Sequence, residues 1–239
     1  VISNCVFDRC RGLALEIVDG GVMEDVSITN ITMRDIVNCP LFIRLGNRGR
    51  GPDGTPVGSI RRINISDINV YDADSRYASL ISGLPGHNIE DVRLSNIRIL
   101  YKGGFTMAQV AAQPAELIND FFSRRESPGS AGPREPFNVP EHEKGYPEPS
   151  IFGLLPAYGL YVRHAENIKV KDVEFTLANA DERSAVVLDD VTDISFENFT
   201  AQTSGEASVF KLFNVSDFST FRVEEVADRY LKHVETDSF

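Results

Sequence analysis

The chain is poor in the residues that build metal centres and disulfide frameworks. Its 239 residues include three cysteines and four histidines, and no two cysteines form a Cys-x-x-Cys pair. An odd number of cysteines without paired spacing favours buried thiols, and a disulfide involving Cys5 or Cys10 is the alternative. The composition therefore predicts no metal site and no cofactor.

Long apolar runs and cationic residues are also scarce. No run reaches about 18 apolar residues, so the sequence predicts no membrane-spanning helix. The chain holds 24 Lys and Arg against 35 Asp and Glu, a net charge of −11, which argues against nucleic acid or an anionic membrane as a whole-surface partner. No signal peptide is visible, but the chain starts within a strand-like phrase, VISNCVF, rather than with Met. We therefore expect an N-terminal part to precede Val1.

What the chain does contain is one short strand-like phrase, written at least five times. Apolar and polar residues alternate, and the phrase ends in Asn or Asp followed by an apolar residue. Copies are MEDVSITNITM (23–33), IRRINISDINV (60–70), IEDVRLSNIRI (89–99), AENIKVKDVEF (165–175) and VTDISFENFTA (191–201). Starting from Asn4, the closing polar residues are 26, 37, 29, 76 and 26 residues apart. A basic period of about 25 residues with insertions indicates a repeat architecture.

The local patterns decide which repeat architecture to expect. Each unit holds short runs of Val, Ile, Phe and Thr with a period of two, which is typical of strands. The units lack the amphipathic helix of a βαβ crossover and the Asn-Gly turns of an antiparallel meander. Strand units of this kind can stack in parallel on their neighbours. The sequence therefore predicts a single all-β domain over residues 1–239, built as a parallel β-solenoid with long loop insertions.

The recurrent Asn and Asp residues have a structural explanation in this architecture. Both tolerate left-handed backbone angles, which a sharp corner requires, and both can bond neighbouring backbone. When such residues stack at one corner, their side chains can also bond each other between repeats. We therefore interpret these as corner residues without a catalytic role: Asn30, Asp67, Asn96, Asp172 and Asn198.

Two insertions interrupt the repeats, and functional residues often lie on such loops. The first is GNRGRGPDGTPVGS (46–59), and the second covers about 101–150 and includes a possible short helix at 114–124. Long loops are uncommon unless they are functional or disordered, so we expect an ordered flap over a binding cleft. Its aromatic residues are Phe105, Phe121, Phe122, Phe137 and Tyr146, and His142, Glu143 and Glu148 are further candidates to line the cleft.

Arginine is concentrated near the first insertion. Five arginines and one acid fall between residues 44 and 62, although the whole chain is acidic. The planar guanidinium group suits carboxylate ligands. The cluster indicates either a site for an anionic ligand or a solvated loop that balances the acidic surface. Arg44, at an outward position of the expected strand 41–45, favours the first interpretation.

Several long phrases resemble the second half of bacterial members of glycoside hydrolase family 28, the polygalacturonase family. The phrases include RLGNR, GTPVGS, SRYASLISGLPGH and YPEPSIFGLLPAYGLYVRH, and the resemblance covers most of the chain. It implies a right-handed parallel β-helix, the pectin-lyase-like solenoid. It also implies a hydrolase acting on an acidic plant cell-wall polysaccharide, polygalacturonan or rhamnogalacturonan, in an extracellular or periplasmic location.

The resemblance implies an inverting mechanism with paired carboxyl groups. The family's His-Gly motif falls at Arg11-Gly12, and its catalytic acids lie roughly one and two repeats upstream of that motif. We therefore expect no catalytic residue within this chain, and low or no activity from this chain alone. The nearest acids to that face are Asp8, Glu16 and Asp19, and their spacing does not mark them as replacements.

The resemblance also predicts substrate-binding residues. The family's Arg-Ile-Lys motif, which holds the substrate carboxylate, falls on Phe42-Ile43-Arg44, so a cation remains at one position and an aromatic ring replaces the other. From the resemblance we expect Arg11, Phe42, Arg44 and Tyr77 to bind substrate. The arginine cluster adds Arg48 and the second insertion adds Tyr146. Two alternatives remain open: a polysaccharide lyase, which would need clustered acids for Ca²⁺, and a non-catalytic carbohydrate-binding or structural solenoid.

Overall fold

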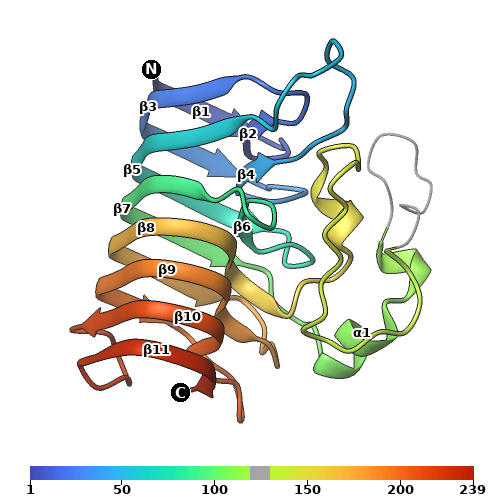
Figure 1. Ribbon diagram of the computed structural model, residues 1–239. Coiled ribbons are helices and arrows are strands. Elements are labelled where there is room, and N and C mark those ends of the chain that lie inside the picture. Colours follow the sequence, from blue (N-terminus) through green and yellow to red (C-terminus); the bar gives the residue numbers. More distant parts are fainter. Residues whose placement is uncertain (119–129) are drawn as a thin grey trace.

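The computed structural model describes residues 1–118 and 130–239, and these residues have the predicted all-β character (Figure 1). The described strands are β1 (Ile2–Asp8), β2 (Leu13–Ile17), β3 (Val22–Arg34), β4 (Leu41–Leu45), β5 (Ser59–Ala73), β6 (Ser79–Ser82), β7 (Ile89–Tyr101), β8 (Ala157–Leu177), β9 (Ser184–Ala201), β10 (Phe210–Phe221) and β11 (Arg229–Ser238). A short helix, α1 (Met107–Ala112), and two 3-10 turns, η1 (Ala115–Leu117) and η2 (Pro149–Phe152), lie between β7 and β8.

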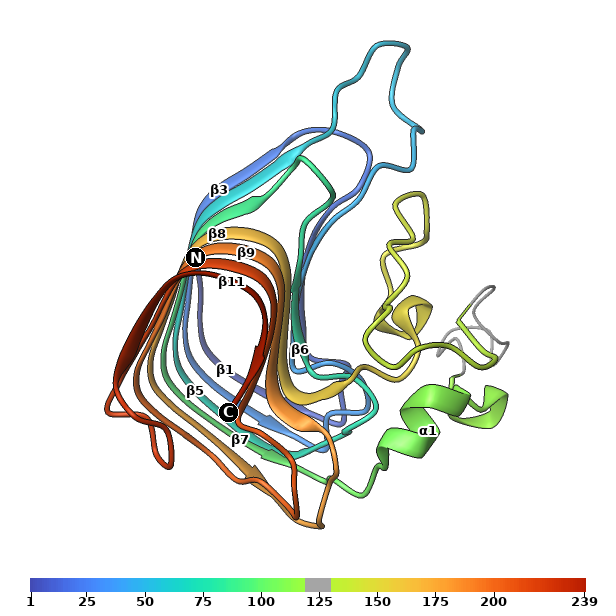
Figure 2. The same ribbon diagram turned by 60° about the horizontal axis from the view of Figure 1, so that its bottom comes forward.

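Neighbouring strands pair in parallel, except at the last pair. One array runs through β1, β3, β5, β7 and the second half of β8, and the other runs through β2, β4, β6 and the first half of β8. Both arrays continue through β9 and β10, after which β11 pairs antiparallel with β10. Figure 2 shows the strands nested on one another along this direction. The mostly parallel pairing agrees with the predicted stacking of repeats.

The main hydrophobic core lies between the two arrays. Strand residues alternate between this core and the outside, because successive side chains point to opposite faces. Buried residues in register form one row from β2 to β9: Leu15, Ile43, Ile81, Val162 and Leu188. The facing array supplies another row: Ile31, Ile68, Ile97, Val173 and Phe199. Each repeat therefore places an apolar residue directly on that of its neighbour.

The strands bend at left-handed residues and continue through them. Within the 21 residues of β8, His164, Asn167 and Asp172 have φ angles of 48°, 55° and 54°. The corner residues predicted from the sequence are also left-handed, with φ of 56°, 57°, 51° and 50° at Asn30, Asp67, Asn96 and Asn198. The predicted left-handed geometry of these corner residues is therefore confirmed.

Side chains at one corner bond those of the next repeat, as the sequence predicts. The Asn30 amide donates to Asn4 Oδ1 at 2.7 Å, and the Asn96 amide donates to Asp67 Oδ1 at 2.7 Å. Near the other end, the Asn198 amide donates to Asp172 Oδ1 at 2.6 Å. These bonds tie consecutive repeats together on the outside of the core, where they are exposed to solvent.

The two insertions occupy the gaps between β4 and β5 and between β7 and β8 (Figure 1). The predicted helix at 114–124 is wrong in its described part. The helix α1 ends at Ala112 and Gln113 adopts a left-handed φ of 46°, so only a 3-10 turn follows. Residues 119–124, with Phe121 and Phe122, lie outside the described residues. We call residues 130–156 the strap, because they run beside β4, β6 and β8.

The cysteines remain free thiols. Cys39 is buried, whereas Cys5 and Cys10 are half-buried and unpaired. The alternative of a disulfide involving Cys5 or Cys10 is therefore wrong. Burial raises the pKa of the Cys39 thiol, which keeps it protonated at neutral pH. In the described ranges, no helix is long and apolar enough to cross a membrane.

Replacing Asn198 by alanine tests the corner. Asn198→Ala removes the bond to Asp172 and leaves at φ 50° a residue whose side chain cannot hydrogen-bond nearby groups. We therefore expect a loss of about 1–2 kcal/mol in the free energy of unfolding. Asn198→Gly loses the same bond but adopts this φ freely, so its loss should be smaller. Urea denaturation measures both, and a loss for glycine equal to that for alanine contradicts the corner argument.

Candidate functional site

The outer face of the β2–β4–β6–β8 array carries two rows of side chains in register. The first row is Ala14, Phe42, Leu80, Tyr161 and Val187. The second row, two residues further along each strand, is Glu16, Arg44, Ser82, Arg163 and Asp189. An apolar row therefore runs beside a charged row on the face opposite the main core.

The strap covers most of the apolar row. Phe42, Leu80 and Tyr161 form a second buried cluster with strap residues that include Phe152 and Leu155. Burying side chains of this size stabilises the contact by roughly 1.5–3 kcal/mol each. The expected flap is therefore ordered in its described part and packs directly on the sheet.

Arg44 holds the strap on the charged row. Its side chain is buried, with Nη1 donating to Ser82 Oγ at 2.8 Å and to the Gly83 carbonyl at 3.2 Å. Nη2 donates to the strap carbonyls of Glu141 at 2.8 Å and His142 at 3.2 Å. Burial and a neighbouring arginine lower the pKa of Arg44 to about 10, so it stays charged at neutral pH.

Arg163 makes a parallel set of contacts two strands away. Its Nη1 and Nη2 donate to the carbonyls of Val139 at 2.7 Å and Pro140 at 3.1 Å. Nη1 also lies 3.1 Å from Glu141 Oε1. The two arginines lie over the ring of Phe152, at 5.1 and 5.7 Å from its centroid. Two buried cations thus fasten one strap segment, mainly through its backbone carbonyls.

His164 links the strap to the corner of the sheet. Its Nε2 lies 3.0 Å from Glu141 Oε1, and its Nδ1 lies 2.7 Å from Asp190 Oδ2. Burial alone would lower the pKa of His164, but the hydrogen bonds to these two carboxylates outweigh it, and the pKa is raised. The protonated imidazole is therefore the form that this arrangement favours.

A pocket of about 220 Å³ lies between strap residues 146–149 and the β2 side of the array. Its lining comes from the β1–β2 connection and β2, from the segment around β4, and from the strap. The lining residues are Arg11, Gly12, Leu13, Ala14, Glu16, Asn38, Cys39, Phe42, Tyr146, Pro147, Glu148 and Pro149. The pocket thus combines a cation, two carboxyl groups and two aromatic rings.

The two carboxyl groups of the pocket lie in different environments. Burial and the negative charge of Glu148 raise the pKa of Glu16 to about 7. Glu148 itself is buried and accepts hydrogen bonds from the Asn38 amide at 2.6 Å, from Ser150 N at 2.9 Å and from the Ser150 hydroxyl. Glu16 therefore exchanges its proton near neutral pH, beside a carboxylate that the protein already satisfies.

The structure brings three of the six predicted substrate-binding residues together. Arg11, Phe42 and Tyr146 all line the pocket. Arg48 lies at its edge, with its guanidinium 5.2 Å from the ring centroid of Tyr146. Tyr77 is instead buried in the cluster beneath the strap, away from the pocket lining.

Arg44 differs most from the expectation. It faces outward, as predicted, but the strap covers it and both terminal nitrogens donate to protein oxygens. The strap carbonyls accept the hydrogen bonds that we expected Arg44 to donate to a ligand carboxylate. Arg44 therefore attaches the strap to the sheet. Among the strap candidates, Glu148 lines the pocket, whereas His142 and Glu143 do not.

Glu16 and Asn38 are the residues that sequence reasoning missed. The alternation in Leu13–Ile17 places Glu16 outward beside Arg44, and that signal was available from the sequence. Its raised pKa was not, because it is caused by burial in the pocket and, to a smaller extent, by the negative charge of Glu148, and both depend on the strap. Asn38 is not part of any repeat phrase, and only its hydrogen bond to Glu148 identifies it as a residue of the pocket.

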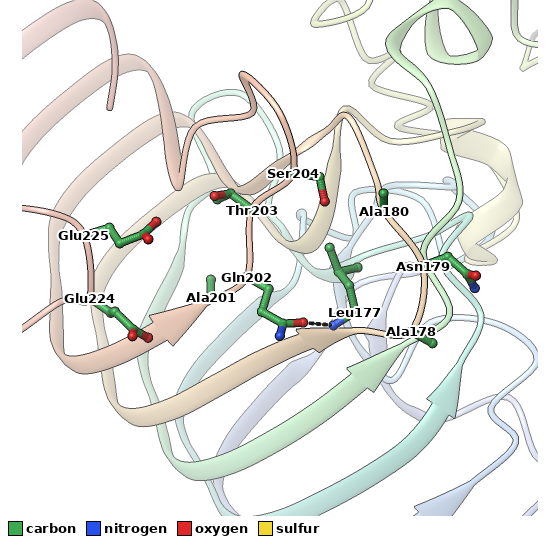
Figure 3. Close-up of a pocket in the computed structure, with 10 residues that line it drawn as sticks. All are labelled: Leu177, Ala178, Asn179, Ala180, Ala201, Gln202, Thr203, Ser204, Glu224 and Glu225. Carbon is green, nitrogen blue, oxygen red and sulfur yellow. Dashed lines mark hydrogen bonds between the residues drawn. The ribbon is translucent and has the colours of Figure 1, made fainter.

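A second pocket, of about 370 Å³, lies at the turns that follow β8, β9 and β10 (Figure 3). Gln202 and Leu177 bond each other there, with Leu177 N donating to Gln202 Oε1 at 2.7 Å. Its acids are Glu224 and Glu225, and among the described residues its lining includes no aromatic ring and no cation. It therefore offers less for a charged sugar than the pocket beside β2. No group of three or more potential metal-ligating side chains occurs in the part of the chain that the structure describes.

Replacing Arg44 tests its role as a fastener. Arg44→Met keeps the apolar stem but leaves buried carbonyls without donors, so we expect a loss of roughly 3 kcal/mol in the free energy of unfolding. Hydrogen exchange should also speed up at residues 139–143. The control is Arg98→Met, since Arg98 is exposed and lies 3.5 Å from Glu174 in a surface pair. Equal losses for both variants contradict the role.

The contribution of His164 should depend on pH. A raised pKa in the folded state means that its stabilisation is complete below the unfolded value of about 6.5 and is lost as the pH rises through the folded value. His164→Asn keeps a residue suited to φ 48° but removes the charge. The variant should be destabilised more at pH 5.5 than at pH 9 in urea denaturation. A pH-independent difference would show that the charged imidazole does not matter.

We compared the chain with known protein families, curated proteins and solved structures. No protein-family model, curated protein or solved structure matches the chain. The resemblance to glycoside hydrolase family 28 stays a prediction.

Proposed function

We propose that the chain is part of a secreted bacterial glycoside hydrolase that cleaves galacturonate-containing pectic polysaccharide. In this proposal the two arrays are the faces of a right-handed parallel β-helix. Parallel register, left-handed corners with side-chain bonds between repeats, and a core enclosed by both arrays support that architecture. A location outside the cytoplasm belongs to the same proposal, because the polymer is extracellular.

The observation that carries the proposal is the convergence of Arg11, Phe42 and Tyr146 on one pocket. They come from three segments that are far apart in the sequence. A guanidinium group recognises the carboxylate of a uronic acid through paired hydrogen bonds. The ring of Tyr146 is 56% exposed and offers an apolar surface to a sugar ring. Sites for small ligands typically combine such apolar walls with a few polar groups.

Catalysis in this proposal is the inverting acid–base reaction, with its Asp residues upstream of Val1. One carboxylic acid protonates the leaving oxygen, and a carboxylate on the opposite side activates water. The outer face of β2 carries Ala14 and Glu16 beside the pocket. A further parallel repeat stacked on β2 would bring its outward residues to this edge, next to Arg11.

The position of the strap favours an enzyme that acts near the end of a polysaccharide chain or on short oligosaccharides. It fills the outer face over β4, β6 and β8, where Arg44 and Arg163 fasten it. A polymer lying along the face would therefore have to end at the pocket beside β2. This geometry favours a blocked cleft, which suits an exo-acting enzyme better than an endo-acting one.

The alternative is a carbohydrate-binding protein without catalysis. Two observations favour it: Arg44 is engaged by the strap, and Glu148 already accepts hydrogen bonds from Asn38 and Ser150. Both groups are thus committed to structure. A reducing-end assay of the native protein with oligogalacturonate separates the two, because sugar binding without release of new ends favours the binding protein.

Titration calorimetry with trigalacturonate tests the site itself. Arg11→Ala removes the cation of the pocket, so we expect affinity to fall by about 1–3 kcal/mol, the value of a charge-assisted hydrogen bond. Arg98→Ala, on the outer face of β7, serves as the matched control and should bind as the unaltered chain does. Equal affinity of both variants contradicts the assignment of the pocket, and so does the absence of any binding.

A further inference from the structure

We propose that Glu16 is a specificity-determining residue of the pocket, and that the site accepts an acidic sugar only while the Glu16 carboxyl group is neutral. This inference rests on the proposed function, because it concerns the same site and the same class of ligand. The spacing of Glu16 in the sequence does not mark it as a catalytic acid, and the repeat pattern assigns it no other role.

The position of Glu16 carries the inference. It lies on the outer face of β2 and lines the pocket together with Arg11, Glu148 and Tyr146. Its register partner on β4 is Arg44, whose terminal nitrogens donate to β6 and to the strap instead. The pocket lining itself thus contains one cation and two carboxyl groups.

The charge of the pocket therefore depends on Glu16. With Glu16 neutral, the positive charge of Arg11 offsets the negative charge of Glu148, and a ligand carboxylate can approach Arg11. With Glu16 ionised, the lining carries a net negative charge in a partly buried space, and an anionic sugar is repelled. Burial and Glu148 raise the pKa of Glu16 to about 7, so the change falls within the ordinary working range of pH.

The neutral form also supplies a hydrogen-bond donor that the ionised form lacks. A protonated carboxyl group donates to a sugar carboxylate or hydroxyl, whereas a carboxylate only accepts. Asn38 lies at the same wall, and its Oδ1 is buried without a partner among the described residues. A sugar hydroxyl is the donor that this oxygen lacks, so Glu16 and Asn38 together complement hydroxyl groups beside the carboxylate held by Arg11.

The test compares the pH dependence of trigalacturonate binding by the full chain and by Glu16→Gln. Glutamine has nearly the same shape, keeps a donor and does not titrate. Affinity of the unaltered chain should fall about 30-fold between pH 6 and pH 8.5, since one linked proton changes affinity about tenfold per pH unit above the pKa. Glu16→Gln should change less than about twofold beyond the effect of the remaining groups, which both proteins share.

Each outcome separates the inference from the function on which it rests. If neither protein binds trigalacturonate at pH 5, the proposed function fails. If both bind with the same pH profile, the function stands and the role of Glu16 is overturned. Circular dichroism establishes whether Glu16→Gln is folded. As a measurement on the unaltered chain, ¹³C NMR of the Glu16 carboxyl group should show its titration midpoint rising on saturation with trigalacturonate, and an unchanged midpoint overturns the inference.

Discussion

Parallel register between consecutive repeats is the constraint on which the rest of the structure depends. Each inward residue must lie on an apolar residue of the next repeat, as Ile43 lies between Leu15 and Ile81. The same register aligns the outward residues, so side chains from separate repeats form continuous rows. Left-handed Asn and Asp residues preserve the register, because they let a strand turn a corner without losing its pairing. Both the core and the candidate site follow from this one geometric requirement.

The strap turns one of these rows into a site. Most of the outer face of the β2–β4–β6–β8 array is covered, and buried arginines compensate the carbonyl groups that the strap brings with it. The uncovered part at β2 keeps Arg11 and Glu16 accessible beside Tyr146. In the proposed function the strap would limit the length of a bound chain. The strap also supplies Glu148, whose charge adds to the effect of burial in raising the pKa of Glu16.

Features that follow the sequence repeat could be predicted from the sequence, and features that depend on the strap could not. Corner residues such as Asn30 and Asn198 could be predicted, because a left-handed turn favours Asn or Asp and the period of about 25 residues repeats this choice along the chain. The role of Arg44 is not local, because the carbonyl that it contacts belongs to Glu141, 97 residues away. The pKa of Glu16 likewise depends on a distant strap residue. Loop segments carry no period, so nothing in the sequence alone places them on a particular strand.

The most direct measurement is a crystal structure of the chain with digalacturonate bound. We expect the sugar in the pocket beside β2, with its carboxylate on Arg11 and its ring against Tyr146, while the strap keeps its contacts with Arg44. Digalacturonate bound instead at the turns around Gln202, or displacing the strap to reach Arg44, would contradict the assignment of the site.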